Sequence, residues 1–339
     1  MLIKRRRNYL IDLKLEIINN HIEKMKINSK TIFLFCLLLG ISCKNKRTEI
    51  KDVKALEDFP SFMVKFSAVP GNPVFTGTNI ETWDKNIRER GYILYEKDQY
   101  RMWYTGYNER ISKNKYLGYA TSLDGIHWER HTKPSVLPEV WVEDMQVLKY
   151  HNLYYMVAEG RGDIAHLLTS ADGISWDSQG SLNILKENGQ PIDEGPYGTP
   201  TVWIENDKKY LFYERNDLGI WLATSEDFKT WTNVQDEPVL VMGPEKYDAG
   251  AVAANQIIKH EGKYYMYYHA STNPDWMKPG VTALWTSNVA MSTDLMNWTK
   301  YPNNPIVEGD HSSPIMVYDG KEYKLFTMHD KVWLYNPID

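Results

Sequence analysis

A repeat of about 55 residues constrains the fold of this chain more than any other feature of its sequence. Four segments share the pattern Ser-x-Asp-x-x-x-Trp, and a run of aromatic residues after a polar turn occurs five times. Repeats of this length indicate an array of similar supersecondary units, each packed against its neighbours. Aligning the five aromatic runs places the following residues in one register, at steps of 54, 55, 55 and 59 residues: Thr105, Glu159, Glu214, His269 and Met328.

Each repeat unit has the composition of short β-strands. The units are rich in Tyr, Trp and Val and are bounded by Gly, Asn and Asp, and no stretch after residue 60 shows sustained helical periodicity. Five such units predict an all-β fold, a five-bladed β-propeller with four-stranded antiparallel blades around a central axis. A β-sandwich is the alternative, but it would not produce this repeat. The fifth unit has no Ser-x-Asp-x-x-x-Trp segment, so we expect an N-terminal strand at residues 62–66 to complete it and close the ring.

The repeated Ser-x-Asp-x-x-x-Trp motif is expected to be structural. Its Asp can cap a tight turn, and its Trp can fill the space between blades. The motif resembles the Asp-box of sialidases, although the glycine spacing and the number of blades differ. We therefore assign no catalytic role to its four copies, which are Ser122–Trp128, Ser170–Trp176, Ser225–Trp231 and Ser292–Trp298.

The N-terminal region has the pattern of a targeting signal. Residues 31–41 are an apolar run too short to span a bilayer comfortably; three lysines precede this run, and Ser42 and Cys43 follow it. The pattern resembles a bacterial lipoprotein signal, in which cleavage before Cys43 leaves a lipidated cysteine. Met25 is the expected start, since it gives a signal of ordinary length at residues 25–42. The alternative is a buried apolar strand with a chance cysteine.

These features predict three segments: a signal region (1–42), a tether (43–58) and a propeller (59–339). We expect a lipid-anchored protein of the bacterial cell envelope, facing the outer membrane or the periplasm, whose only contact with the membrane is the lipid.

Charge and cysteine content exclude several functions. After residue 42 the chain has 31 basic and 41 acidic residues, and no basic run follows residue 47. Nucleic acid is therefore not an expected partner, because phosphate binding needs clustered Lys and Arg. Both cysteines, Cys36 and Cys43, precede the repeats, so the propeller has no disulfide, thiolate metal site or cysteine nucleophile. No cofactor and no metal ion are expected.

Charged residues at the starts of inner strands mark a candidate site. In a propeller the first strand of each blade lines the axis and the second runs back, so the start of the first and the end of the second share one face. Charges in such apolar strands are costly to bury unless they are paired or functional. Counting back about ten residues from each aromatic run reaches these positions: Arg88-Glu89-Arg90, Glu143-Asp144, Thr199, Asn255 and Ser312-Ser313.

Three segments resemble the five-bladed glycoside hydrolase superfamily over about residues 70–337. Glu194-Gly195-Pro196 looks like the motif of glycoside hydrolase family 43 whose Glu is the general acid, and residues 267–271 look like a strand of that family. Residues 142–145 resemble the inner-strand segment of families 43, 32 and 130 whose Asp orients the acid or holds the sugar. The first blade has no Asp-Pro motif, Met follows Asp144, and Glu194 is about five residues further from its aromatic run than in family 43. The family within the superfamily is therefore left open.

The resemblance implies a glycosidase that cleaves an external oligo- or polysaccharide with two carboxyl groups, one as acid and the other as base or nucleophile. On this basis Glu194 is the expected acid, and Glu89 is the expected base or nucleophile, with Asp84 as its alternative. Asp144 would raise the pKa of the acid and hold it in place.

Other polar residues near the same face are expected to bind substrate, although salt bridges at the rim are an equal alternative for each arginine. Aromatic residues that could stack on sugars include Trp83, Trp141 and Trp276. A glycoside phosphorylase is the nearest alternative function, since Arg88, Arg90 and His269 could hold phosphate. A glycan-binding propeller and a protein-interaction propeller are further alternatives. The expected substrate-binding residues are Arg88, Arg90, Glu143, Glu159, Tyr197, Glu214, Asp248 and His269.

Overall fold

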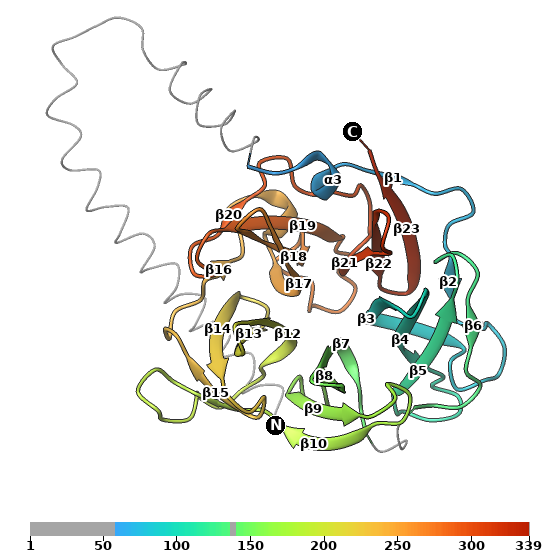
Figure 1. The fold of residues 1–339 in the computed structure, drawn as a ribbon, viewed down its shortest axis with the longest axis horizontal. Helices are drawn as coiled ribbons and strands as arrows, with labels where there is room; N and C mark the ends of the chain where they lie inside the picture. The colour runs from blue at the N-terminus through green and yellow to red at the C-terminus, as the bar shows by residue number, and fades with distance from the viewer. Residues whose placement is uncertain (1–57, 136–139, 339) are drawn as a thin grey trace, which may run out of the picture. The chain divides into compact units, whose positions relative to one another are not determined.

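Each repeat unit forms one small β-sheet, and the five sheets are arranged in a ring (Figure 1). The computed structural model describes residues 58–135 and 140–338. The prediction of an all-β, five-bladed propeller is confirmed, and the aromatic runs are the second strands of the blades.

Four blades follow one another along the chain, each from the axis outward. The first contains β3 (Asn86–Glu96), β4 (Gln99–Tyr107), β5 (Tyr116–Ser122) and β6 (Glu129–Arg130). The second contains β7 (Glu143–Tyr150), β8 (Leu153–Glu159), β9 (Ala165–Ser170) and β10 (Asp177–Ser181). The third contains β12 (Gly198–Glu205), β13 (Lys208–Glu214), β14 (Gly219–Ser225) and β15 (Thr230–Asn233), with β11 (Asn183–Leu185) and β16 (Leu240–Val241) added at its outer side. The fourth follows a 3-10 turn, η1 (Lys246–Asp248), and contains β17 (Ala251–His260), β18 (Lys263–Ser271), β19 (Trp285–Ser292) and β20 (Thr299–Lys300).

The fifth blade closes the ring with strands from both ends of the propeller. It contains β21 (Pro314–Tyr318), β22 (Tyr323–Met328) and β23 (Lys331–Pro337), and both β1 (Phe66–Ala68) and β2 (Phe75–Thr76) pair with β23. The expectation of an N-terminal closing strand is confirmed, but its predicted position at residues 62–66 is wrong. Residues 61–64 form a short helical turn, α3 (Ser61–Val64), because Met63 and Val64 are both buried instead of alternating between two faces.

The Ser-x-Asp-x-x-x-Trp motif forms the turn before each outer strand of blades one to four. In the third blade the Oδ1 atom of Asp227 accepts hydrogen bonds from the backbone N–H of Lys229 and of Thr230, both at 2.8 Å. The residue after the Asp has a left-handed backbone, as at Phe228 with φ 63°. The Trp directly precedes or begins the outer strand, so its predicted equivalent position in four blades is confirmed.

Replacing Asp227 by alanine is expected to lower the free energy of unfolding by about 1–2 kcal/mol, the usual effect of removing a side-chain cap. Burial alone would raise the pKa of Asp227, but the backbone donors outweigh it and lower the pKa. The stabilisation is therefore present near neutral pH and is lost as the pH falls through the folded pKa. Urea denaturation of wild type and variant at neutral and acidic pH measures the difference in their free energies of unfolding. If that difference is the same at the two pH values, the ionised carboxylate does not have the role described here.

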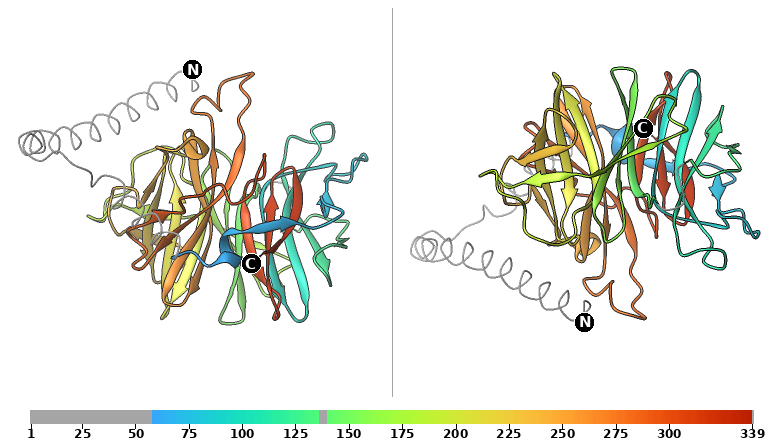
Figure 2. Two further views of the ribbon diagram at one scale, coloured as in Figure 1. Left: turned by 90° about the horizontal axis from the view of Figure 1, so that it is seen from above. Right: turned by 90° about the horizontal axis from the view of Figure 1, so that it is seen from below.

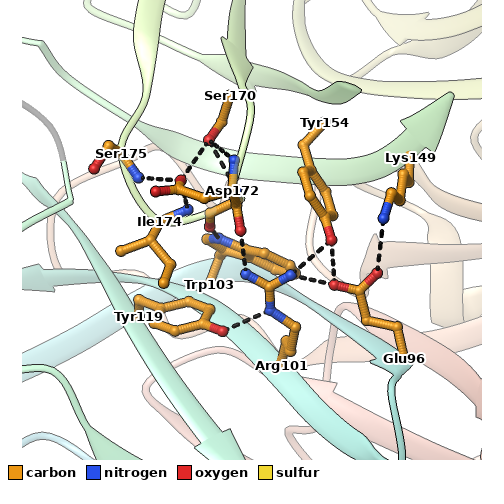
Figure 3. A network of polar contacts seen from close by, with 11 residues as sticks. Glu96, Arg101, Trp103, Tyr119, Lys149, Tyr154, Ser170, Asp172, Ile174 and Ser175 are labelled. Carbon is orange, nitrogen blue, oxygen red and sulfur yellow. Dashed lines mark hydrogen bonds and ion pairs between the residues drawn. The ribbon is translucent and has the colours of Figure 1, made fainter. Parts of the chain in front are cut away.

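Tyrosines at the starts of second strands connect neighbouring blades at the end opposite the candidate site. Tyr100 donates a 2.9 Å hydrogen bond to Asp319, and Tyr264 donates one of 2.5 Å to Glu205. Figure 3 shows the corresponding contact between the first two blades, in which the Tyr154 hydroxyl donates a hydrogen bond to Glu96. Arg101 donates hydrogen bonds to Glu96, to the Tyr119 hydroxyl and to the carbonyl of Asp172, which lies in a Ser-x-Asp-x-x-x-Trp turn. Each network therefore connects two neighbouring blades through side-chain hydrogen bonds.

The predicted signal at 25–42 and lipidated Cys43 lie outside the described residues, as does the tether apart from Asp58, and they remain predictions. Among residues 58–135 and 140–338, no helix is long and apolar enough to cross a membrane.

Candidate active site

Local irregularities at the starts of the inner strands position the candidate site. Hydrogen-bond register shifts occur near the starts of β3, β7, β12 and β17. Bulged residues re-aim side chains, and left-handed backbone is uncommon for residues other than glycine. The left-handed residues are Glu89 (φ 58°), Asp144 (φ 43°), Thr199 (φ 42°) and, just before β21, Ser313 (φ 59°). The predicted strand starts are therefore the places where the inner strands depart from regular geometry.

Arg90 fills the region between the inner strands and is completely buried. Its Nη1 donates to the Thr201 hydroxyl at 2.8 Å and to the Ala254 carbonyl at 2.7 Å, and its Nη2 donates to the Pro200 carbonyl at 2.7 Å and to the Asp144 carbonyl at 2.5 Å. These acceptors belong to the second, third and fourth blades. Arg90 was expected to bind substrate, but its side chain is completely buried and both terminal nitrogens of its guanidinium are hydrogen-bonded within the protein.

Asp144 is a buried carboxyl group beside other carboxylates. Its side-chain Oδ1 accepts a 3.2 Å hydrogen bond from the backbone N–H of Arg90. Burial, with the nearby negative charge of Glu89, raises the pKa of Asp144 to about 8, against the opposing effect of Arg90. Asp144 is therefore protonated at neutral pH, the state that a general acid requires.

Glu89 belongs to a chain of charged contacts on the side of the site formed by the first two blades. Arg88 forms ion pairs with Glu89 and, at 3.0 Å, with Glu143. The Trp141 indole N–H donates to Glu143 at 2.5 Å, and the His329 ring lies 3.9 Å from Glu89. The Glu89 side chain remains 26% exposed, so it is within reach of solvent or a ligand.

Glu159 and Glu214 form a second carboxyl pair at the ends of β8 and β13. The backbone N–H of Thr199 donates to Glu159 at 3.2 Å, and that of Gly198 donates to Glu214 at 2.9 Å. A side chain at residue 198 would collide with both carboxyl groups as they are placed here, so Gly198 allows the two carboxyl groups to approach the backbone. Burial, followed by the charge of neighbouring carboxylates, raises the pKa of both groups well above its usual value.

His269 lies near the end of β18, the second strand of the fourth blade, and its imidazole ring is neutral. Its Nδ1 lies 3.0 Å from the Asn255 amide and 3.5 Å from the Ser313 hydroxyl. Burial, together with the positive charges of Arg90 and His329, lowers the pKa of His269 to about 3. It therefore contributes a hydrogen-bonding ring to the site but no positive charge near neutral pH.

Four predicted site residues lie apart from these contacts. Glu194 is exposed in the loop before β12, next to Asp193, whose carbonyl accepts a 2.7 Å hydrogen bond from Arg215. The Tyr197 hydroxyl donates to the Leu182 carbonyl at 2.9 Å. The other two are buried in ion pairs: Asp84 with Arg130 at 2.9 Å and Asp248 with Lys300 at 2.5 Å. The contacts of Asp84 and Asp248 are those of structural ion pairs. Within the described part of the chain, no hydrogen bond connects Asp84 with Glu89 or Asp144.

Sequence reasoning missed His329 as a neighbour of Glu89. The available signal was its position directly after Met328, which belongs to the aligned register at the ends of second strands. It also missed the backbone carbonyls around Arg90, which leave no trace in the sequence. No group of three or more His, Cys, Asp or Glu residues arranged to hold a metal ion occurs within 58–135 and 140–338.

Two characterised phosphorylases are similar to this chain in sequence, whereas no protein-family model matches it. A 1,2-β-oligomannan phosphorylase from Thermoanaerobacter sp. (strain X514) is 26% identical over 240 residues, which cover 66% of this chain and 77% of that protein. A β-1,2-mannobiose phosphorylase from the same strain is 26% identical over 252 residues, covering 66% and 78%.

Solved structures with the same fold include glycoside hydrolases. A putative glycosidase from Bacteroides thetaiotaomicron VPI-5482 has a TM-score of 0.67 and 17% identity, covering 83% of this chain and 99% of that one. A structure from the GH130 family of mannoside phosphorylases, which contains hydrolases that target β-1,2 mannosidic linkages in Candida mannan, has a TM-score of 0.63 and 17% identity, covering 82% and 96%. The resemblance to the five-bladed glycoside hydrolase superfamily is therefore confirmed at the level of the fold.

Proposed function

We propose that this chain hydrolyses a glycosidic bond in an oligo- or polysaccharide, with Asp144 as the general acid and Glu89 as the base or nucleophile. The observation that carries the proposal is the contrast between these two carboxyl groups. Asp144 is buried with a pKa of about 8, whereas Glu89 is partly exposed and ion-paired with Arg88. A buried, protonated carboxyl group beside an ion-paired carboxylate is the usual basis of acid–base glycosidase chemistry.

The geometry supports Asp144 as the acid better than Glu194, the acid expected from the sequence. A general acid must keep its proton near neutral pH, and burial beside another carboxylate provides this at Asp144. Glu194 is exposed, and no described contact joins its side chain to Glu89 or Asp144. Its role as an acid remains a prediction.

Charge distribution favours water over phosphate as the second substrate. Phosphate sites in proteins are built from free cationic groups and N–H donors. In this site Arg88 is paired with two glutamates, Arg90 is buried against carbonyls, and His269 is neutral. Carboxyl groups predominate around them: Glu89, Glu143, Asp144, Glu159 and Glu214. A phosphate dianion would find none of these three groups free to bind it, whereas water needs only a carboxylate that accepts its proton.

Phosphorolysis is the second candidate, because the two characterised relatives by sequence are named as phosphorylases. Their names also make β-1,2-mannosides the first substrates to test. We expect the protein to release mannose from β-1,2-mannobiose in phosphate-free buffer, with a rate that added phosphate does not raise. The products can be separated by ion-exchange chromatography. Formation of mannose 1-phosphate, with no turnover when phosphate is absent, would instead establish phosphorolysis.

A further inference from the structure

The connection between β18 and β19 projects from the same end of the ring as the candidate site. Residues 272–284 join the end of β18 to the start of β19, and Figure 2 shows this orange segment extending beyond the other loops. Second strands end on the site's face, where His269 in β18 corresponds to Glu159 and Glu214 in β8 and β13. The projecting segment therefore begins three residues after His269.

Internal hydrogen bonds hold this segment in a defined conformation. The backbone N–H of Thr272 donates to the Leu284 carbonyl at 3.0 Å, and the Asn273 amide donates to the Thr282 carbonyl at 3.2 Å. The backbone N–H of Trp276 donates to the Asn273 carbonyl at 3.1 Å. The segment is thus a folded hairpin extension that fixes the position of Trp276.

Two indole rings extend outward from His269. The Trp285 ring lies 5.6 Å from the His269 ring at an interplanar angle of 74°, and the Trp276 ring lies 5.0 Å from Trp285 at 75°. Such edge-to-face contacts help to fix the orientation of the rings. Both tryptophans remain partly exposed, so indole surface borders the site on the side of the fourth blade.

The other aromatic candidates on this face are less available to a ligand. Trp83 is stacked on Tyr104 at 6.0 Å and 13°, which covers one face of its ring. The Arg161 guanidinium lies 4.8 Å over the Trp141 ring, and the Trp141 N–H is used by Glu143. These contacts make Trp83 and Trp141 parts of the framework, whereas the Trp276–Trp285 pair keeps partly exposed indole surface on the side of the fourth blade.

We propose that Trp276 and Trp285 form a sugar-stacking subsite next to the cleavage position, which binds an additional pyranose unit of an oligosaccharide. The inference rests on the proposed glycosidase function and specifies its substrate class. The apolar C–H face of a pyranose suits an indole surface, and the neutral His269 beside it places no cation there. Residues 272–284 therefore select chain length: a longer oligosaccharide gains a contact that a disaccharide does not reach.

Binding of β-1,2-mannobiose and β-1,2-mannotetraose tests the subsite. The full chain carrying Asp144→Asn, which is expected to slow turnover strongly, is compared with the same protein carrying Trp276→Ala or Met277→Ala in isothermal titration calorimetry. Met277 is the matched control, since it is the next residue of the hairpin and is 51% exposed. Trp276→Ala should weaken mannotetraose binding roughly 3- to 10-fold, as expected for one aromatic contact, and leave mannobiose binding unchanged. Met277→Ala should change neither.

Kinetics on the wild-type background provide a second measurement if Asp144→Asn reduces folding. The ratio of kcat/KM for the tetrasaccharide to that for the disaccharide should fall by the same factor in Trp276→Ala. Three results would overturn the subsite. Trp276→Ala could reduce binding or kcat/KM equally for both sugars, or Met277→Ala could cause the same loss as Trp276→Ala. The third result is that the protein without either substitution binds the tetrasaccharide no more tightly than the disaccharide. A Trp276-dependent preference for the longer sugar without turnover in the wild type would support the subsite and refute the hydrolase function.

Discussion

Replacing Asp144 by asparagine is expected to lower turnover of a glycoside with a poor leaving group about 10²–10⁴-fold, the usual contribution of a general acid. Asparagine keeps the shape of the side chain but has no transferable proton. An activated substrate such as a dinitrophenyl glycoside should lose much less, because its leaving group needs little protonation. Steady-state kinetics with both substrates measure the difference.

Glu194→Gln is the matched control for this experiment, because Glu194 is the acid expected from the resemblance to family 43. If Asp144 is the acid, Glu194→Gln should change turnover of both substrates little. A selective loss on the poor leaving group in Glu194→Gln, with Asp144→Asn active, would transfer the acid role to Glu194. Equal losses on both substrates in Asp144→Asn, with folding intact, would contradict proton donation by Asp144.

The raised pKa of Asp144 also determines two pH dependences. An acid with a pKa of about 8 is active while protonated, so kcat/KM should decline as the pH rises through about 8. The unfolded chain releases this proton near pH 4, so the free energy of unfolding should fall as the pH rises from there towards 8. Asp144→Asn should remove that contribution and be at least as stable as the wild type at neutral pH. Thermal unfolding of the two proteins across this pH range measures the effect.

The architecture could be predicted because its repeating elements are local. The Ser-x-Asp-x-x-x-Trp turn is fixed by hydrogen bonds within a few residues, as between Asp227 and Lys229, and therefore appears directly in the sequence. The regular spacing of the aromatic runs then gives the number of blades. The prediction of a closing strand at residues 62–66 was wrong because Met63 and Val64 are buried by residues that are distant in the sequence. One of these residues is Tyr267, whose hydroxyl donates a 2.9 Å hydrogen bond to the Met63 carbonyl.

The sequence could predict on which face of the propeller the site lies, but not the state of its charged groups. The positions of Glu89 and Asp144 follow from the repeat, because equivalent strand starts converge in a closed ring. The state of each charged group depends on contacts between blades that no local pattern contains. Arg88 and Arg90 are two residues apart in one strand, yet the partly exposed Arg88 pairs with two glutamates and Arg90 is buried against carbonyls. Protonation follows the same rule, since the pKa of Asp144 is set by burial and by Glu89 from another blade.

Arg90→Met is expected to lower the free energy of unfolding by about 3–5 kcal/mol, the typical loss when one partner of a buried charged network is removed. Methionine fills much of the volume but donates no hydrogen bond. The carbonyls of Asp144, Pro200 and Ala254 would then be left without the donor that now connects three blades.

Arg88→Met is the control, because the Arg88 side chain is 37% exposed, whereas Arg90 is completely buried, so its ion pairs should contribute less to stability than the Arg90 network. Chemical denaturation should therefore separate the two variants, with Arg88→Met losing less stability than Arg90→Met while its hydrolytic activity falls, since Glu89 loses its partner. Equal stability of Arg90→Met and wild type would show that the blades hold together without the central guanidinium. A stability loss in Arg88→Met as large as that in Arg90→Met would contradict the division between a structural arginine on the axis and a functional one at the surface.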